Sequence, residues 1–242
     1  MKHLYEKREL TFSLIWVGLY VALYSITDNL SRSIGTEKVL TAPLSVVFVV
    51  VLYIWIRKNG LCKKYGLCAF DGKAKDYLYF IPLFVIGSCN LWNGVQLNCS
   101  PIETALYVLS MLCVGFIEEV IFRGFLFKAM AKDGIKSAII VSSITFGLGH
   151  IINLLNGAEF LPTLLQVIYA TAIGFLFTML FHKGKSLWPC IITHSIVNSL
   201  SVIGVENTTT GKIISAVILT VVSFGYGVLL CKNKNIAKHN TQ

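Results

Sequence analysis

The sequence predicts an all-α, polytopic membrane protein with about eight transmembrane helices and both chain ends in the cytoplasm. Three observations support this fold class. Of the 242 residues, 55% are hydrophobic and only 14% are charged, and the mean hydropathy is +0.70. The apolar residues form eight runs separated by polar segments, and Lys and Arg gather in every second segment. A soluble domain of this size could not bury so many apolar faces.

Each apolar run is a candidate membrane span, because a hydrocarbon core of about 30 Å needs roughly 20 helical residues. The first run begins at Leu10 with no small-residue cleavage site behind it, so we expect a span and not a removed signal peptide. The third run is shorter. The expected spans are residues 10–26, 39–56, 77–90, 103–128, 137–155, 162–181, 187–204 and 213–231.

The distribution of basic residues predicts the orientation. The amino-terminal arm, the segments after spans two, four and six, and the tail carry 17 of the 21 Lys and Arg. The opposite segments hold Arg32, Lys38 and Lys212, and Arg123 lies within span four. The positive-inside rule therefore places both termini in the cytoplasm. The net charge of +9 does not follow one face, so nucleic acid is not an expected partner.

Two adjacent carboxylates, Glu118 and Glu119, interrupt the fourth span. An ionisable side chain at the centre of a bilayer costs about 2.5–3.5 kcal/mol on insertion scales, so such a pair predicts a functional site. Arg123 follows Glu119 by four residues and can form an ion pair along the helix. A purely structural Glu119–Arg123 pair is the alternative interpretation.

Two later spans carry further pairs that share one helical face: Phe146 with His150, and His194 with Asn198. From the helical rise, Glu118, His150 and His194 lie roughly 10–20 Å from the cytoplasmic ends of their spans. We therefore expect the three to meet near the midplane. Either histidine alone could be a packing residue, and Asn198 alone could join two helices by a hydrogen bond. The combination of these residues with the glutamate pair favours a functional site.

This set of side chains suits peptide hydrolysis, which needs a base for water, a donor for the oxyanion and a proton for the leaving amine. A carboxylate in a poorly solvated site fits the base, and the histidines and the Asn198 amide can supply hydrogen bonds. Glu118, His150 and His194 could instead bind zinc or another divalent metal, although a His-Glu-x-x-His motif is absent. Metal use stays open.

Three motifs in this order resemble the CPBP family of intramembrane proteases, also called Abi: the two glutamates and arginine of residues 118–123, Phe-x-x-x-His at 146–150, and His-x-x-x-Asn at 194–198. The family includes type II CAAX prenyl endopeptidases and bacteriocin-processing or self-immunity proteins. The resemblance covers about residues 103–204. The first hundred residues add only topology.

The resemblance implies a role for each matched residue. Glu118 would activate water with help from His150, His194 and Asn198 would form the oxyanion site, Glu119 and Arg123 would support the centre, and Phe146 would pack beside it. The family has been described both as metalloproteases and as glutamate-dependent enzymes, so the cofactor stays open. Which glutamate is the base is also open, because adjacent helical residues point about 100° apart.

We therefore expect three segments: residues 1–102 with three helices, residues 103–204 as the catalytic core with helices four to seven, and residues 205–242 with the last helix and a basic cytoplasmic tail. The expected protein is a multi-pass endopeptidase of the cell membrane. Its partners would be membrane lipid and a membrane-associated or lipidated peptide. The alternatives are a non-catalytic self-immunity protein and a transporter whose glutamate pair relays protons.

Overall fold

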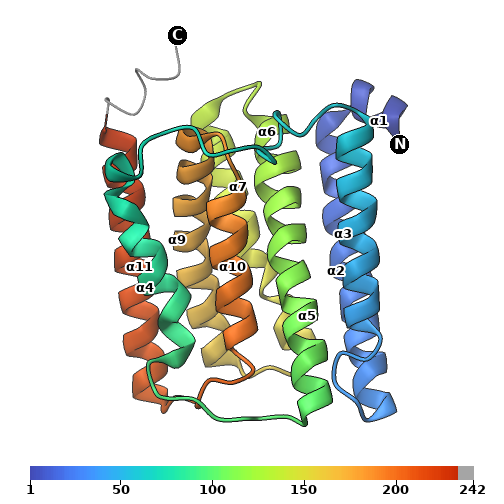
Figure 1. The fold of residues 1–242 in the computed structure, drawn as a ribbon, viewed down its shortest axis with the longest axis vertical. Helices are drawn as coiled ribbons and strands as arrows, with labels where there is room; N and C mark the ends of the chain where they lie inside the picture. Colours follow the sequence, from blue (N-terminus) through green and yellow to red (C-terminus); the bar gives the residue numbers. More distant parts are fainter. Residues whose placement is uncertain (234–242) are drawn as a thin grey trace.

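The structure, a computed structural model that describes residues 1–233, is a bundle of helices that run alongside one another (Figure 1). Its α-helices are α1 (Lys2–Lys7), α2 (Glu9–Ile34), α3 (Thr41–Lys58), α4 (Ile81–Ser88), α5 (Pro101–Glu118), α6 (Phe127–Met130), α7 (Ile135–Gly149), α8 (Ile152–Leu155), α9 (Phe160–Gly184), α10 (Trp188–Leu200) and α11 (Thr209–Lys232). Two 3₁₀ helices, η1 (Ala74–Phe80) and η2 (Cys89–Leu91), flank α4, and a π-helix, η3 (Glu119–Leu126), continues α5. The all-α membrane fold is confirmed.

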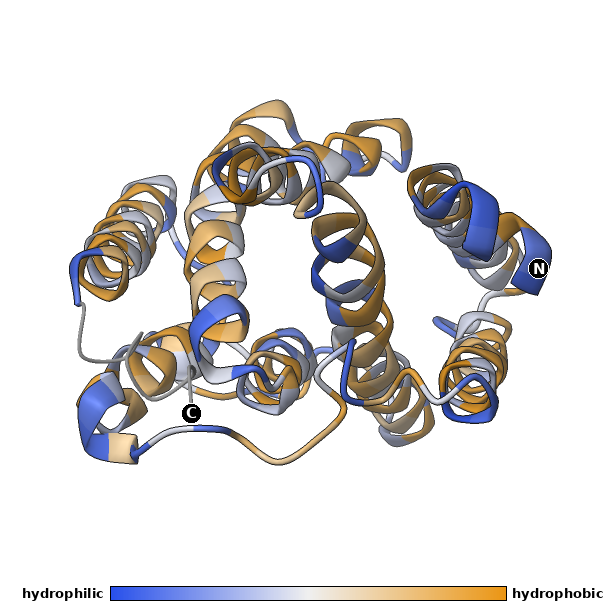
Figure 2. Cartoon of the chain, turned by 90° about the horizontal axis from the view of Figure 1, so that it is seen from above, coloured by the Kyte–Doolittle hydropathy of each residue, from blue (hydrophilic) through white to orange (hydrophobic). Residues whose placement is uncertain are grey.

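Six helical segments are long and apolar enough to cross a membrane, and they coincide with six of the eight expected spans. They are Glu9–Ile34, Thr41–Lys58, Pro101–Met130, Ile135–Leu155, Phe160–Gly184 and Thr209–Lys232. Hydrophobic residues cover most of each helix, and hydrophilic residues gather at the helix ends and in the connections (Figure 2). The chain is therefore a multi-pass membrane protein.

The two other expected spans have shorter helices. The third was expected from Tyr77, but Tyr77, Leu78 and Tyr79 have non-helical dihedral angles and α4 begins only at Ile81, with a proline in its first turn. At the seventh expected span, residues 187–204, helix α10 has only 13 residues. The two short helices pack against each other within the bundle. Because α1 and the end of α11 lie at the same end of the bundle (Figure 1), the arrangement agrees with an even number of crossings.

The fifth expected span is also interrupted. Helix α7 ends at Gly149, His150 and Ile151 form a turn, and α8 adds one further turn before Asn156. His150 therefore lies at a helix end and not within a continuous helix as expected. The expected basic tail falls largely on residues 234–242, outside the described residues.

The interior is formed mainly by two segments. About half of the span window is buried in Pro101–Met130 and in Phe160–Gly184, against a third or less in the other four spans. Helix α9 packs against α7 and α11, while α5 packs against α3 and α10. The segment that carries both glutamates is thus enclosed by helices from both halves of the chain.

Candidate functional site

The glutamate pair lies where α5 changes into a π-helix. Glu118 is the last residue of α5 and Glu119 is the first of η3, whose eight residues are all buried. A π-helical stretch inside an α-helix is rare and occurs often at functional sites. Within this π-helix Glu119 and Arg123 form a buried ion pair, with 3.0 Å between Arg123 Nη1 and Glu119 Oε1.

Glu119 and Arg123 are both fully buried, with 0% of their surface exposed. His194 on α10 contacts the same carboxylate oxygen, with 2.8 Å between His194 Nδ1 and Glu119 Oε1. The Arg123 guanidinium also lies over the Phe146 ring, 3.9 Å from its centroid, which is cation–π geometry. A buried charge needs such partners, because an unpaired one is strongly destabilising.

Glu118 lies in a different environment from its neighbour. It is 9% exposed, and its Oε1 accepts a short hydrogen bond from the Tyr20 hydroxyl on α2. Its other oxygen, Oε2, faces His194 Nε2 at 3.6 Å. His194 therefore lies between the two carboxylates, with Nδ1 on Glu119 and Nε2 toward Glu118. The structure distinguishes two glutamates that the sequence could not.

A glycine sets the close approach of α10 to α5 beside these carboxylates. A Cβ at Gly115 would lie 2.2 Å from Ser195 Oγ and 2.6 Å from Ser195 N, so no side chain fits there. Ser195 also donates a hydrogen bond to the Leu112 carbonyl at 3.0 Å. Because Ser195 follows His194 directly, this contact fixes the position of His194 along the axis of α5 relative to the glutamates.

His150 and Asn198 stand at the edge of the cluster. The Phe146 ring contacts the rings of both His150, at 5.5 Å between centroids, and His194, at 5.6 Å. Asn198 is half-buried and lies one turn beyond His194 on α10. Neither the His150 nor the Asn198 side chain makes a hydrogen bond to another residue of the described chain, so both are free to bind a ligand.

Several buried polar atoms of the cluster also lack a partner within residues 1–233: Glu119 Oε2, Arg123 Nε and Arg123 Nη2. Buried polar groups in proteins are nearly always hydrogen-bonded to protein or to ordered water. These three buried atoms therefore have unused hydrogen-bonding capacity beside the two carboxylates.

Comparison with known proteins assigns this part of the chain to a family. Residues 100–200 match the family model described as "Type II CAAX prenyl endopeptidase Rce1-like". The chain is also 29% identical over 99 residues to a Bacillus subtilis (strain 168) protein named "Putative membrane peptidase YdiL". Residues 100–200 are therefore similar to the CPBP family, and we call them the CPBP segment. The alignment covers 40% of this chain and only 36% of the relative, and no solved structure matches the chain.

The match confirms the resemblance that the three motifs indicated. All seven expected site residues of the CPBP segment lie within residues 100–200, and the contacts above connect Glu118, Glu119, Arg123, Phe146, His150 and His194 into one cluster. Asn198 lies on the same face of α10 as His194, without a measured contact to the carboxylates.

The same geometry tests the expected metal ligands. Among the described residues, no group of three or more His, Cys, Asp and Glu side chains is close enough to hold a metal ion. Glu118 Oε1 is already bonded to Tyr20, and Glu119 is already bonded to Arg123 and His194. The set Glu118, His150 and His194 therefore does not fit a metal in this arrangement.

Sequence reasoning missed Tyr20, because it assigned only topology to the first hundred residues. A signal was present: Phe12, Trp16, Tyr20 and Tyr24 recur every four residues and so form one aromatic face on the first span. In the structure all four are buried, and the hydroxyl of Tyr20 reaches the CPBP glutamate.

Proposed function

We propose that this protein is an intramembrane endopeptidase of the cell membrane, which hydrolyses a peptide bond in a membrane-associated or lipidated peptide. The observation that carries the proposal is the position of Glu118, which is anchored through one oxygen by Tyr20 and faces His194 through the other. The CAAX-type family match supports the same class of reaction.

Glu118 serves as the base for water. Its Oε2 and His194 Nε2 are 3.6 Å apart, and one water molecule at hydrogen-bond distance can contact both atoms. Glu118 takes a proton from this water while the water oxygen attacks the carbonyl carbon of the peptide bond. The electron pair of the C=O bond moves to the carbonyl oxygen, which becomes the oxyanion. The proton then passes from Glu118 to the leaving nitrogen as the C–N bond breaks.

The neighbours of Glu118 stabilise the charge that develops. Glu119 is paired with Arg123 and accepts from His194 Nδ1, which orients the ring with its Nε2 toward Glu118. In this step His194 carries a proton on both ring nitrogens before water attacks and keeps both throughout, so Nε2 donates to the oxyanion without any proton leaving the ring, and the Asn198 amide on the same helical face adds a second donor. His150, held beside His194 by Phe146, assists the water.

Cleavage of a panel of membrane peptides by purified protein in lipid tests this proposal. Loss of a positioned base typically costs about 10²- to 10⁴-fold, so Glu118→Gln should cleave at least 100-fold more slowly than the wild type. His194→Ala should be similarly impaired. Glu159→Gln, at an exposed glutamate before α9, is the matched control and should cleave normally.

Two results would contradict the proposal. Equal cleavage by wild type, Glu118→Gln and His194→Ala would exclude the assigned residues. Undiminished protection of cells by Glu118→Gln in an immunity assay, without cleavage by the wild type, would favour the non-catalytic self-immunity function. We expect a chelator to leave cleavage unchanged, and loss of activity that zinc restores would instead assign a metal to the site.

A further inference from the structure

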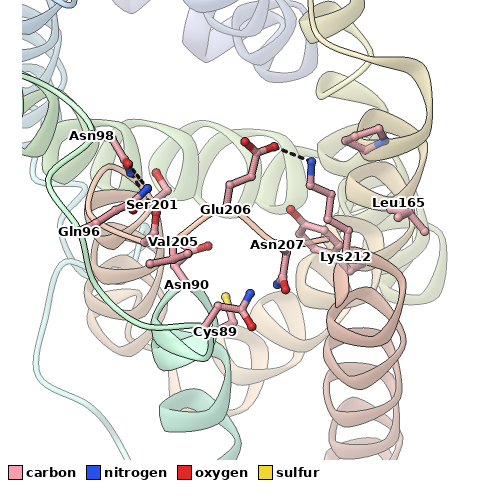
Figure 3. Close-up of a pocket in the computed structure, with 14 residues that line it drawn as sticks. Cys89, Asn90, Gln96, Asn98, Leu165, Ser201, Val205, Glu206, Asn207 and Lys212 are labelled. Atoms are coloured by element: carbon pink, nitrogen blue, oxygen red, sulfur yellow. Dashed lines mark hydrogen bonds and ion pairs between the residues drawn. The ribbon is translucent and has the colours of Figure 1, made fainter. Parts of the chain in front are cut away.

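A polar cavity of about 530 Å³ lies at the end of the bundle where α9 and α11 begin (Figure 3). Its volume is within the range of ligand-binding pockets in proteins. The walls come from η2 and the loop that follows it, the start of α9, the residues after α10 and the start of α11. Side-chain amides dominate the lining, from Asn90, Asn93, Gln96, Asn98 and Asn207.

The amide NH₂ groups in this lining are largely used within the protein. Asn90 Nδ2 donates to the Val197 carbonyl at 2.6 Å, and Asn98 Nδ2 donates to two carbonyls after α10. Gln96 Nε2 donates to Asn98 Oδ1 at 2.6 Å. In the described part of the chain, Asn90 Oδ1 and Gln96 Oε1 accept no hydrogen bond, so the cavity presents free acceptors to a ligand that carries N–H groups.

The cavity is close to neutral. Its two charged residues, Glu206 and Lys212, pair with each other at 2.7 Å across the rim (Figure 3). This hydrogen bond from Lys212 holds the pKa of the Glu206 carboxyl below its usual value, so the pair stays ionised. The paired charges leave the cavity without a net charge that would attract an ionic ligand, which favours an uncharged polar one.

The wall is fixed before any ligand arrives. The loop after η2 pairs with the segment after α10: Gln96 N donates to the Ile203 carbonyl at 2.8 Å, Val205 N donates to the Gly94 carbonyl at 3.3 Å, and Val95 and Gly204 form an antiparallel bridge. A preformed pocket loses less conformational entropy on binding than one that must be ordered by its ligand.

One face of α10 connects this cavity to the proposed catalytic residues. His194, Asn198 and Ser201 are spaced at i, i+4 and i+7 and so share a helical face, and Ser201 lines the cavity. Seven residues of helix span roughly 10 Å. An extended peptide rises about 3.3 Å per residue, so about three residues would reach from His194 to the cavity.

We propose that this cavity is a substrate subsite that binds an uncharged, polar stretch of the substrate peptide, beginning about three residues from the scissile bond. The inference rests on the proposed function. Backbone N–H groups and Asn, Ser or Gln side chains of that stretch donate to Asn90 and Gln96. The catalytic residues thus act on the buried part of the peptide while its polar flank is held at the end of the bundle.

Cys89 provides a direct test of binding, because this free thiol lines the cavity. The full chain with Glu118→Gln, in lipid vesicles, is alkylated in the presence of a synthetic peptide. One peptide has an alanine–leucine membrane core and a flank of Asn, Ser and Gln, and a second lacks the flank. We expect the flanked peptide alone to slow alkylation of Cys89, with Cys231 on α11 unaffected as measured by mass spectrometry.

A kinetic test uses Gln96→Leu, which removes one free acceptor. Loss of one hydrogen bond should raise the KM for a cleaved, flanked peptide about 3- to 10-fold, with no change in kcat or in the KM for its unflanked form. The control is Thr210→Leu. Thr210 is exposed at the same end of the bundle but does not line the cavity, so the KM and kcat of this variant should equal those of the wild type.

The outcomes separate this inference from the proposed function. Cleavage without flank-dependent protection of Cys89 and without a KM change would overturn the subsite and leave the peptidase intact. Protection of Cys89 without cleavage by the wild type would support the cavity and contradict the enzyme. Alkylation that depends on lipid composition and not on the peptide would overturn the inference in favour of a lipid headgroup.

Discussion

The CPBP segment and the amino-terminal helix α2 contribute opposite kinds of side chain to one buried cluster. The segment 100–200 supplies the charged groups, and Glu119 Oε1 joins Arg123 and His194. Helix α2 supplies a neutral aromatic face, from which the Tyr20 hydroxyl donates a hydrogen bond to Glu118. The matched region therefore contains the charged groups, whereas the structure shows that one of their hydrogen-bond partners lies outside it.

This difference separates the two glutamates. Glu119 depends entirely on partners within the CPBP segment and is fully buried. Glu118 is slightly exposed and depends on a residue almost a hundred positions away. We infer that changes to the Glu119–Arg123 pair and to the packing beside it mainly alter stability, and that a change at Tyr20 mainly alters catalysis. Three substitutions test this division.

Arg123→Met should have the largest effect. It leaves Glu119 as a buried charge without its cation, and breaking a buried pair in this way costs about 3–5 kcal/mol. Thermal unfolding of the purified protein in lipid should show a clear fall in midpoint. The double variant Glu119→Gln with Arg123→Met should recover much of the loss, because it removes both charges.

The matched control for this pair is Lys2–Glu6, which is also an i, i+4 ion pair but has side chains more than half exposed. Exposed pairs typically contribute less than about 1 kcal/mol, so Lys2→Met should unfold at nearly the wild-type temperature. A midpoint for Arg123→Met as high as that of Lys2→Met would show that the Glu119–Arg123 pair does not support the core.

Gly115→Ala should have the next largest effect, because it forces α10 away from α5. The added methyl group would collide with the Ser195 backbone, and overpacking of this kind costs up to about 3 kcal/mol, more than alanine gains over glycine in a helix. Gly18→Ala is the control on α2, where a Cβ meets nothing within 4 Å. Unfolding midpoints that move equally for both variants would contradict the proposed close contact.

The sequence predicted the fold class and the residues of the cluster better than it predicted their geometry. Hydropathy located six membrane-length helices because bilayer thickness directly sets their length. Hydropathy did not predict the helix boundaries at residues 77–80 and at His150, where local backbone geometry delays the start of one helix and ends another. The four-residue spacing predicted that Glu119 would lie beside Arg123, but not that both would lie in a π-helix.

The support for Glu118 was harder to predict. Tyr20 is uncharged and belongs to none of the three motifs. The sequence does not reveal that its hydroxyl, unlike that of other tyrosines, is bonded to Glu118. Contacts between helices far apart in the sequence depend on packing angles and helix rotation, which a single sequence does not fix. Gly115 is similar, because its importance comes from the neighbour that it allows to approach.

Tyr20→Phe should have the smallest effect on stability and a specific effect on catalysis. The variant keeps the ring, which packs against Tyr24, and removes the hydrogen bond that orients Glu118. A hydrogen bond to a charged group contributes about 1.5 kcal/mol or more, so kcat should fall at least about tenfold, while we expect KM to stay unchanged because the Tyr20 side chain is buried and its hydroxyl is bonded to Glu118. Tyr24→Phe is the matched control: its hydroxyl bonds Ser45 at 2.6 Å instead of the carboxylate, so its kcat should equal that of the wild type. Equal kcat values for Tyr20→Phe and Tyr24→Phe would mean that α2 merely seals the site, and the support of Glu118 would then have to come from the CPBP segment alone.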